Sequence, residues 1–246
     1  MRAAVYSGTR NLYPGMVTAA KSLVHNSNVE EVFFLIEDDK FPEELPSQIK
    51  TINVSGQGFF QKTGANFKTS FTYMSLLRVC YTKLFPDIDK ILQLDVDTVV
   101  VDDISDLWDI DLKNKWFAAV EETHSTYKPF GPKYYNIGVA MFNLDQIRKD
   151  QVDEKLIHYL NTVTTPYIDQ DAWNRYGIGK DVKLPSRYNE SIVTAYSETP
   201  AIVHYAGFKD WQNSDRVPRR EYLKKYRDMT WKEALNGKGN DRGSNI

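Results

Sequence analysis

The sequence has one cysteine, Cys80, and no long apolar run among its 246 residues. A single thiol cannot form a disulfide within the chain and cannot by itself bind a metal ion, so nothing indicates an oxidising compartment. The longest clean apolar run covers residues 32–36, whereas a membrane-spanning helix needs roughly 20 apolar residues. No signal-peptide core develops after Met1. We therefore expect a cytoplasmic protein.

An excess of charge of either sign is also missing. The chain has 31 basic residues against 33 acidic ones, a net charge of −2. A dedicated nucleic-acid-binding domain needs a broad basic surface, so this balance excludes that class and predicts no nucleic-acid partner. The hydrophobic share of 41% and the charged share of 26% are ordinary for a globular protein and exclude a collagen-like or largely disordered chain.

Segments typical of strands and helices alternate through the first half of the sequence. Pro14 suits the first turn of a helix, and the apolar residues after it recur at intervals of three and four. A second helix is predicted over 70–85, ending before Pro86. The predicted strands cover residues 3–7, 32–36, 49–54, 91–94 and 98–101. Such alternation predicts a Rossmann-like sheet whose ligands bind beyond the carboxyl ends of its strands.

The second half of the sequence is mixed. We predict strands at 117–120, 136–142 and 201–204, and helices at 144–160, 170–176 and about 221–235. Residues 237–246 are rich in glycine, asparagine and charge, which predicts a frayed tail. The expected fold class is α/β, with a mixed, mostly parallel sheet flanked by helices.

Four Asp-x-Asp pairs occur in the sequence, although a composition of 21 aspartates predicts roughly two by chance. Only Asp95 and Asp97 directly follow a run of apolar residues, so we expect their carboxylates on rigid backbone at the edge of the sheet. Two such close carboxylates repel each other, and a divalent cation, Mn²⁺ or Mg²⁺, relieves the repulsion. The alternative is a solvated turn in which the aspartates cap backbone amides. The other pairs are Asp87/Asp89, Asp109/Asp111 and Asp169/Asp171.

His204 ends the predicted strand 201–204 and is followed closely by Gly207 and Lys209. A neutral imidazole suits a third metal ligand, a glycine lets backbone amides approach an anion, and a lysine offers positive charge to phosphate. A lone histidine at a strand end is more often structural, but this one has neighbours of matching chemistry. The pattern predicts a metal and phosphate site that joins His204 to Asp95 and Asp97.

Six pieces of the sequence occur in a characteristic order. They are 4–13 with 20–23, Arg78, 94–100 (LDVDTVV), 135–144 (YNIGVAMFNL), 169–171 (DQD), and 204–207 (HYAG) with Lys209 and Trp211. In this order they resemble the retaining nucleotide-sugar glycosyltransferases of family eight, the group of glycogenin and bacterial lipopolysaccharide galactosyltransferases. The resemblance covers most of the chain, and the shared order carries it because each piece alone is weak evidence.

The resemblance implies a GT-A fold, a UDP-sugar donor, Mn²⁺ as the usual metal, and hexosyl transfer with retention at the anomeric carbon. The donor sugar would be glucose or galactose, and the hydroxyl acceptor a glycan, a lipid-linked glycan or a protein. The family's functional positions fall into four groups in this sequence. The nucleotide would be bound by Ser7, Thr9 and Tyr13 at the base and ribose, and by Val96; the metal ligands would be Asp95, Asp97 and His204. The donor sugar would be held by Arg78, Asn136, Asp169 and Gln170, and the diphosphate by Gly207 and Lys209. Asp169 and Gln170 would also be the catalytic residues.

Two departures from the family pattern affect these assignments. The spacing from Gly207 to Lys209 is one residue short and Asp210 replaces the family's proline, so the assignment of Lys209 agrees less well than that of His204. The family also has an acidic residue after its central strand, for which Glu121 and Glu122 are equal candidates. Other positions have structural alternatives: a rim aromatic for Tyr13, a surface ion pair for Arg78, a turn or strand-edge amide for Asn136, and a helix cap for Asp169 and Gln170.

Two other enzyme classes share parts of the pattern. Residues 95–99 fit the nucleophile motif of haloacid-dehalogenase-like phosphatases, but that motif normally lies near the first strand. Residues 8–10 (GTR) fit the loop of sugar nucleotidyltransferases, but the glycine-rich run before it is missing. A nucleotide-sugar-binding protein without turnover is a third alternative.

The resemblance predicts one GT-A domain over 1–211, followed by a basic, aromatic helix and a flexible tail over 212–246. The segment 212–236 has a net charge of +3 with interleaved aromatics, so it either contacts an anionic membrane peripherally or packs on the domain as a closing helix. The polar stretch 55–69 is a candidate lid over the donor.

Overall fold

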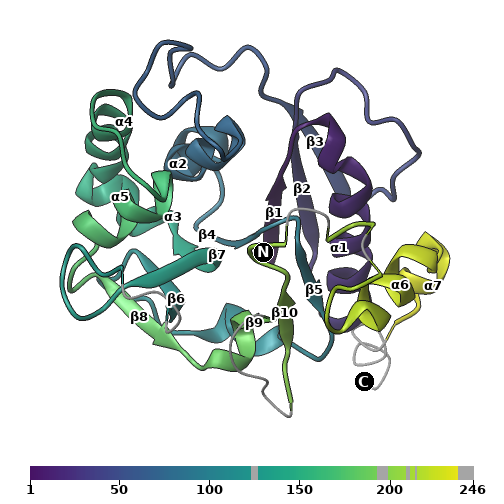
Figure 1. Cartoon of the computed structure of the whole chain (residues 1–246). Coiled ribbons are helices and arrows are strands. Elements are labelled where there is room, and N and C mark those ends of the chain that lie inside the picture. Colours follow the sequence, from purple (N-terminus) through teal and green to yellow (C-terminus); the bar gives the residue numbers. More distant parts are fainter. Residues whose placement is uncertain (123–126, 193–198, 209–210, 214, 238–246) are drawn as a thin grey trace.

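The computed structural model describes residues 1–122, 127–192, 199–208, 211–213 and 215–237. No helix within those ranges is long and apolar enough to cross a membrane. The described residues form one mixed sheet covered by helices on both faces, with a second, small sheet beside it (Figure 1).

The large sheet has seven strands in the order β3-β2-β1-β4-β7-β6-β8. Its first four strands are parallel, β7 runs antiparallel to both of its neighbours, and β8 is parallel to β6. The predicted mixed, mostly parallel sheet is therefore confirmed. The strands are β1 (Ala3–Ser7), β2 (Glu31–Ile36), β3 (Ile49–Asn53), β4 (Lys90–Leu94), β6 (Phe117–Glu121), β7 (Tyr135–Asn143) and β8 (Asp181–Leu184).

Helices cover the two faces of this sheet in separate groups (Figure 1). One group is α1 (Tyr13–Asn26), α6 (Arg220–Asp228) and α7 (Trp231–Leu235). The other is η2 (Tyr73–Cys80), α2 (Tyr81–Leu84), α3 (Leu144–Asp150), α4 (Val152–Thr162) and α5 (Ile168–Tyr176). Short 3₁₀ turns lie in the connections at η1 (Arg10–Leu12), η3 (Ser105–Asp109) and η4 (Ser186–Asn189).

The period-two alternation of strand side chains divides the core in two. In β1, Ala3 and Val5 face the cluster under η2, α4 and α5, whereas Ala4 and Tyr6 face the cluster under α1. All four are fully buried, as expected for a central parallel strand that is covered on both faces. Ser7, the last residue of β1, lies at the carboxyl edge of the sheet.

The small sheet joins β5 (Thr98–Val100), β10 (Ile202–His204) and β9 (Glu190–Ser191) in the order β5-β10-β9. β10 runs antiparallel to β5, and Thr98 pairs with His204. This register brings the histidine beside the turn between β4 and β5, although the two segments lie in opposite halves of the sequence.

Several predicted elements are present with different ends. The predicted helix 70–85 begins at Tyr73 and is 3₁₀ up to Cys80. The predicted helix 144–160 breaks at Gln151, whose φ of 52° is left-handed. The predicted helix 221–235 breaks at Met229, which is extended. The strands β8 and β9 were not predicted, and the tail predicted from 237 lies outside the described residues beyond Gly237.

The candidate lid 55–69 is hydrogen-bonded to α4 and the turn after it. The buried Asn66 donates to the carbonyls of Leu160 and Val163 at 2.8 and 2.6 Å, and Asn161 donates to Phe59 O at 2.9 Å. The middle of the segment is thus fastened beside α4, and the proposed movement over a donor stays a prediction.

The segment after residue 211 packs on the domain through its apolar residues. Leu223 and Tyr226 of α6 are buried, and the Tyr226 hydroxyl accepts a 2.7 Å hydrogen bond from Asn26 of α1. Ala234 of α7 is fully buried in the core under α1. The aromatic positions of this segment therefore contribute to packing.

Candidate functional site

The turn between β4 and β5 carries Asp95 and Asp97 and is held by backbone hydrogen bonds on two sides. Asp95 N donates to Gly138 O of β7 at 2.7 Å, and the Thr98 hydroxyl donates to Asp95 O at 2.6 Å. Tyr205 N, just after β10, donates to Asp97 O at 2.8 Å. Both carboxylates therefore project from fixed backbone at the carboxyl edge of the sheet, as predicted.

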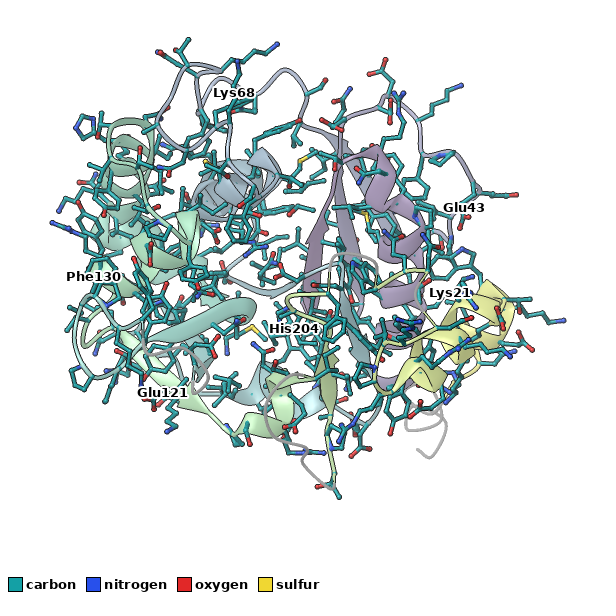
Figure 2. The ribbon with its side chains drawn as sticks, in the orientation of Figure 1. Lys21, Glu43, Lys68, Glu121, Phe130 and His204 are labelled. Atoms are coloured by element: carbon teal, nitrogen blue, oxygen red, sulfur yellow. The ribbon has the colours of Figure 1, made fainter. Side chains whose placement is uncertain are left out.

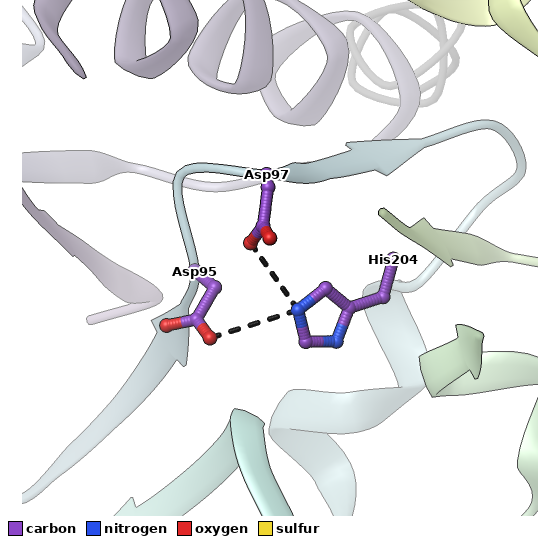
Figure 3. A group of neighbouring side chains, drawn as sticks. All are labelled: Asp95, Asp97 and His204. Atoms are coloured by element: carbon purple, nitrogen blue, oxygen red, sulfur yellow. Dashed lines mark ion pairs between the residues drawn. The ribbon is translucent and has the colours of Figure 1, made fainter. Parts of the chain in front are cut away.

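The imidazole of His204 points between these two carboxylates (Figure 3). Its Nε2 atom lies 3.2 Å from Asp97 Oδ1 and 3.6 Å from Asp95 Oδ2. One ligand atom from each of the three residues lies within 4.8 Å of the others. We call Asp95, Asp97 and His204 the Asp–His cluster. Two carboxylates and one imidazole form a set of ligand atoms that could hold a divalent metal ion.

The charges of the Asp–His cluster perturb one another. Burial raises the pKa of Asp95, even though Arg78 opposes the shift. Burial would also raise the pKa of Asp97, but the attraction to His204 outweighs it and the pKa is lowered. Burial would lower the pKa of His204, but Asp97 and Asp95 raise it. The cluster thus behaves as one interacting group of charges.

Arg78 projects from η2 and bridges two carboxylates. Its guanidinium contacts Asp95 Oδ1, and its Nη1 donates to Asp169 Oδ2 at 3.2 Å. Burial would lower the pKa of Arg78, but Asp169 and Asp95 raise it above the ordinary value, so the guanidinium stays charged. Burial raises the pKa of Asp169 to about 7 despite this ion pair. Arg78, whose side chain is 11% exposed, therefore bridges the Asp–His cluster and α5, which excludes the surface ion pair considered above.

Asp169 and Gln170 lie in the first turn of α5, next to a strained residue. Ile168, which precedes them, has a φ of 34°, a left-handed value that β-branched residues rarely adopt. Asp169 is 2% exposed. Gln170 Oε1 accepts a 3.1 Å hydrogen bond from Ile137 N of β7. This contact orients the Gln170 amide across the end of the sheet.

Asn136 lies on β7 between the Asp–His cluster and an acidic residue. Its Oδ1 accepts a 2.9 Å hydrogen bond from Gly138 N, and its Nδ2 donates to Glu122 Oε2 at 3.2 Å. Glu122 lines the same pocket, whereas Glu121 pairs with Lys128 and Lys183 at 3.3 and 2.8 Å. Of the two acidic candidates, Glu122 is thus the one in the pocket.

These side chains line one pocket of about 360 Å³. Figure 2 shows His204 near the centre of the molecule, between the half that carries Lys21 and the half that carries Phe130. Gly207, also in the lining, has a φ of +85° with open space where a side chain would lie, so a ligand can approach its backbone closely. Eight predicted site residues meet here: Arg78, Asp95, Asp97, Asn136, Asp169, Gln170, His204 and Gly207.

Four of the other predicted residues lie outside this lining. Ser7 and Thr9 are half-buried at the end of β1 and after it, and Val96 packs against the core. Tyr13 is 2% exposed in α1 and its ring is packed on Phe41, with centroids 4.9 Å apart.

The Tyr13 hydroxyl is also engaged, since it donates to Asp38 Oδ2 at 3.0 Å and accepts from Glu37 N at 2.9 Å. Because the ring of Tyr13 is buried, stacking of a base on it would require neighbouring residues to move, and the assignment of Tyr13 stays a prediction. Trp211 is buried against Gly15, away from the pocket. Lys209 lies outside the described residues, and its phosphate role also stays a prediction.

Several residues of the pocket and of the network that supports it were not predicted from the sequence. The lining includes the aromatic side chains of Phe71, Tyr134 and Tyr167. Tyr134 and Tyr167 are fixed through Asp171, which accepts from the Tyr134 hydroxyl at 2.5 Å and from Tyr167 N at 3.0 Å. Asp171 is the second aspartate of the DQD piece, so the motif itself pointed to this network.

Comparisons with known proteins identify the family and the fold of the chain. Residues 4–215 match the model of glycosyl transferase family 8. A Haemophilus influenzae protein with a glycosyltransferase description is 27% identical over 205 residues, which cover 75% of this chain and 62% of that protein. The chain spans only 62% of that relative's length, so the match does not by itself give this chain the activity of the whole relative.

Two solved structures share the fold. Glycosyltransferase GlyE of Streptococcus pneumoniae superposes with a TM-score of 0.74 at 24% identity, over 96% of this chain and 62% of GlyE. Galactosyltransferase LgtC, solved with donor and acceptor sugar analogues, has a TM-score of 0.70 at 20% identity, over 95% of this chain and 100% of LgtC. This likeness confirms the predicted GT-A fold. Since the family model covers most of the sequence, the chain belongs to glycosyl transferase family 8.

Proposed function

We propose that the protein is a metal-dependent, retaining hexosyltransferase that moves glucose or galactose from a UDP-sugar to a hydroxyl of a saccharide or similar acceptor. The observation that carries this proposal is the Asp–His cluster, which opens into a pocket lined by Arg78, Asn136, Asp169 and Gln170. Membership of glycosyl transferase family 8 supports the reaction class, and LgtC, whose solved complex contains donor and acceptor sugar analogues, supports a sugar donor and a sugar acceptor.

The Asp–His cluster would hold the metal, with Mn²⁺ favoured and Mg²⁺ as the alternative. Asn189 Oδ1 lies 2.8 Å from His204 Nδ1, so the other ring nitrogen, Nε2, faces the two carboxylates. When bound, the cation supplies positive charge to the diphosphate of the leaving UDP. Backbone amides near Gly207, where the chain can be approached closely, would add donors to the same phosphates.

Retention at the anomeric carbon requires either two displacements or attack on the face that the leaving group vacates. Asp169 is 2% exposed and paired with Arg78, and the Gln170 amide is a poor nucleophile that already accepts from Ile137 N. These contacts disfavour either side chain as a nucleophile and so favour front-face attack. In that route Asp169 and Gln170 orient the donor sugar, and the leaving phosphate oxygen takes the proton of the acceptor.

The rival functions differ in what they release. A haloacid-dehalogenase-like phosphatase hydrolyses small phosphate esters, and a sugar nucleotidyltransferase releases pyrophosphate from UTP. Membership of the family disfavours both, and a donor-binding protein without turnover is the remaining alternative. Peripheral contact with an anionic membrane through 212–236 stays a prediction, and burial of Leu223, Tyr226 and Ala234 supports the packing role of this segment instead.

The deciding assay is the release of UDP from a panel of UDP-sugars, with and without Mn²⁺. We expect release to depend on the cation and to be fastest with UDP-glucose or UDP-galactose. Release of inorganic phosphate from esters or of pyrophosphate from UTP would support a rival. Tight binding of a UDP-sugar with no release, with every saccharide acceptor tried, would contradict catalysis.

The variant Asp97→Asn tests the cluster directly. The amide is a weak ligand and loses the charge that attracts the cation, so we expect turnover to fall by about 10²-fold or more, in the range seen when one electrostatic contact to a transition state is lost. Asp109→Asn is the matched control, because Asp109 begins another Asp-x-Asp pair but is exposed on η3. Unchanged turnover of Asp97→Asn with Mn²⁺ present would refute the metal assignment.

A further inference from the structure

Behind the Asp–His cluster, a short chain of hydrogen bonds runs from the backbone of β7 to the imidazole. Gly138 N donates to Asn136 Oδ1 at 2.9 Å, and Asn189 Nδ2 donates to the same oxygen at 2.9 Å. Asn189 Oδ1 lies 2.8 Å from His204 Nδ1. Asn189 is 8% exposed and lies behind the residues that line the pocket.

The direction of each hydrogen bond in this chain follows from its first member. A backbone N–H can only donate, so the Asn136 atom that faces Gly138 must be the carbonyl oxygen. That oxygen can only accept, so Asn189 must turn its NH₂ group toward Asn136. The oxygen of Asn189 then faces His204 Nδ1, and this nitrogen must carry the proton.

The consequence appears at the other ring nitrogen. In a neutral imidazole with its proton on Nδ1, Nε2 keeps its lone pair, and Nε2 is the atom 3.2 Å from Asp97 Oδ1 and 3.6 Å from Asp95 Oδ2. A histidine that binds a metal through one nitrogen commonly donates its other N–H to an oxygen nearby, which fixes the ring and raises its basicity.

We propose that Asn189 is a positioning residue that fixes the tautomer and the orientation of His204 for metal binding. The same side chain holds Asn136 with its NH₂ group toward Glu122 and the pocket, so one amide sets both a metal ligand and a donor-sugar residue. This role rests on the proposed function, since it presumes that a cation binds the Asp–His cluster.

The local fold explains how Asn189 comes to be there. It ends η4, and the next residues form β9, which pairs in parallel with β10 so that Ser191 lies opposite His204. The small sheet therefore fixes the separation of Asn189 and His204 through the backbone. The asparagine amide carries its donor, Nδ2, and its acceptor, Oδ1, on two separate atoms, and the two contacts use one each.

Two substitutions separate the two contacts. Asn189→Leu keeps a similar volume but removes both, so we expect Mn²⁺ affinity to fall by about 10- to 100-fold, as for other residues that support metal ligands. Asn189→Asp keeps an oxygen for His204 Nδ1 but cannot donate to Asn136. We expect it to bind Mn²⁺ within a few-fold of the natural protein and to raise the KM for the donor.

The measurement is Mn²⁺ binding to the whole protein without donor, followed by the electron paramagnetic resonance of free Mn²⁺. Arg187→Ala is the matched control, because Arg187 lies in the same turn but pairs with Asp102 at 2.7 Å and is 3.4 Å from Thr199 O. Wild-type affinity in Asn189→Leu, or equal weakening in the Asp and Leu variants, would overturn the proposal. Equal weakening in Arg187→Ala would also do so, because it would show a general effect of loosening η4.

A second measurement needs neither turnover nor metal. In ¹⁵N-histidine-labelled protein, long-range ¹⁵N–¹H spectra distinguish the two neutral tautomers, and four histidines occur in the sequence. At a pH where the ring is neutral, we expect His204 to carry its proton on Nδ1, and a proton on Nε2 would overturn the proposal. If the protein binds Mn²⁺ and shows this tautomer but releases no UDP, the proposed function fails while the role of Asn189 stands.

Discussion

Gly138 lies so close to the Asp–His cluster that a methyl side chain at this position would overlap two of its members. A Cβ at this position would lie 2.5 Å from His204 Cε1 and 2.6 Å from Asp95 Oδ2. Both atoms belong to side chains that are held by other hydrogen bonds, so neither can give way freely. The glycine is therefore required by the close approach of β7 to the site.

Gly138→Ala should disrupt the cluster more than the fold. Overpacking of this kind lowers the free energy of unfolding by about 1–3 kcal/mol. For a chain of this size, each kcal/mol lowers the melting temperature by about 2–4 °C. We expect Mn²⁺ binding to be lost while the protein still folds. Gly56→Ala is the control, since a Cβ there would meet nothing within 4 Å. Normal Mn²⁺ binding in Gly138→Ala would show that the cluster adapts.

Most of the site could be predicted at the residue scale because its chemistry lies at strand ends and in short motifs. Asp95, Asp97 and His204 each follow or end a run of apolar residues, and the DQD piece identified Asp169 and Gln170. Asn189 could not be predicted in this way, since it acts on other side chains and its position depends on the pairing of β9 with β10.

At the scale of elements, the first turn of α1 packs against Trp211, in the segment after β10. Gly15 is buried, and a Cβ there would lie 2.3 Å from Cη2 of Trp211, whose indole is 6% exposed. The loop between β10 and Trp211 carries Gly207, which lines the pocket. Trp211 thus holds this loop against α1 rather than contacting a ligand in the pocket.

Gly15→Ala should displace the indole and lower stability, again by about 1–3 kcal/mol. In the double variant with Trp211→Phe, the smaller ring leaves room for the methyl group, so we expect part of the loss to be recovered. Thermal unfolding of the four proteins of this cycle measures the coupling between the two residues, expected at about 0.5–3 kcal/mol. Additive losses would mean that the contact does not fasten the loop.

The ends of the helices were harder to predict than their existence. Periodicity correctly indicated helices over 144–160 and 221–235 but not their breaks. The first break is a left-handed Gln151, which no residue preference announces. The second break had a signal: Thr230 and Glu233 form a capping box, a Thr-x-x-Glu pattern that marks the start of α7. Two-residue β9 is too short for any pattern.

At the scale of the whole molecule, Asp150 connects the end of α3 to the outer strands of the large sheet. Its carboxylate accepts from Trp116 Nε1 at 2.6 Å, from Lys180 Nζ at 3.0 Å and from Gln146 Nε2 at 2.7 Å. The hydrogen bond from Trp116 is the main reason that the pKa of Asp150 is lowered. The carboxylate therefore stabilises the fold in its ionised form.

This network predicts a pH dependence of stability. Because the folded-state pKa of Asp150 is depressed, its contribution is fully present above the ordinary aspartate pKa of about 4 and is lost as the pH falls through the folded-state value. Asp150→Asn should lower the urea midpoint at neutral pH and reduce its dependence on pH in that acidic window. Asp109→Asn, exposed on η3, serves as the control. A variant that is as pH-dependent as the natural protein would rule out this role.

The antiparallel pairing of β5 with β10 also bears on the order in which the molecule can be completed. Thr98 pairs with His204 across more than 100 residues of intervening sequence, and bringing residues so distant together costs loop-closure entropy. A nascent chain that ends before β10 therefore carries the acidic pair without its imidazole. The three members of the Asp–His cluster therefore come together only once β10 has paired with β5.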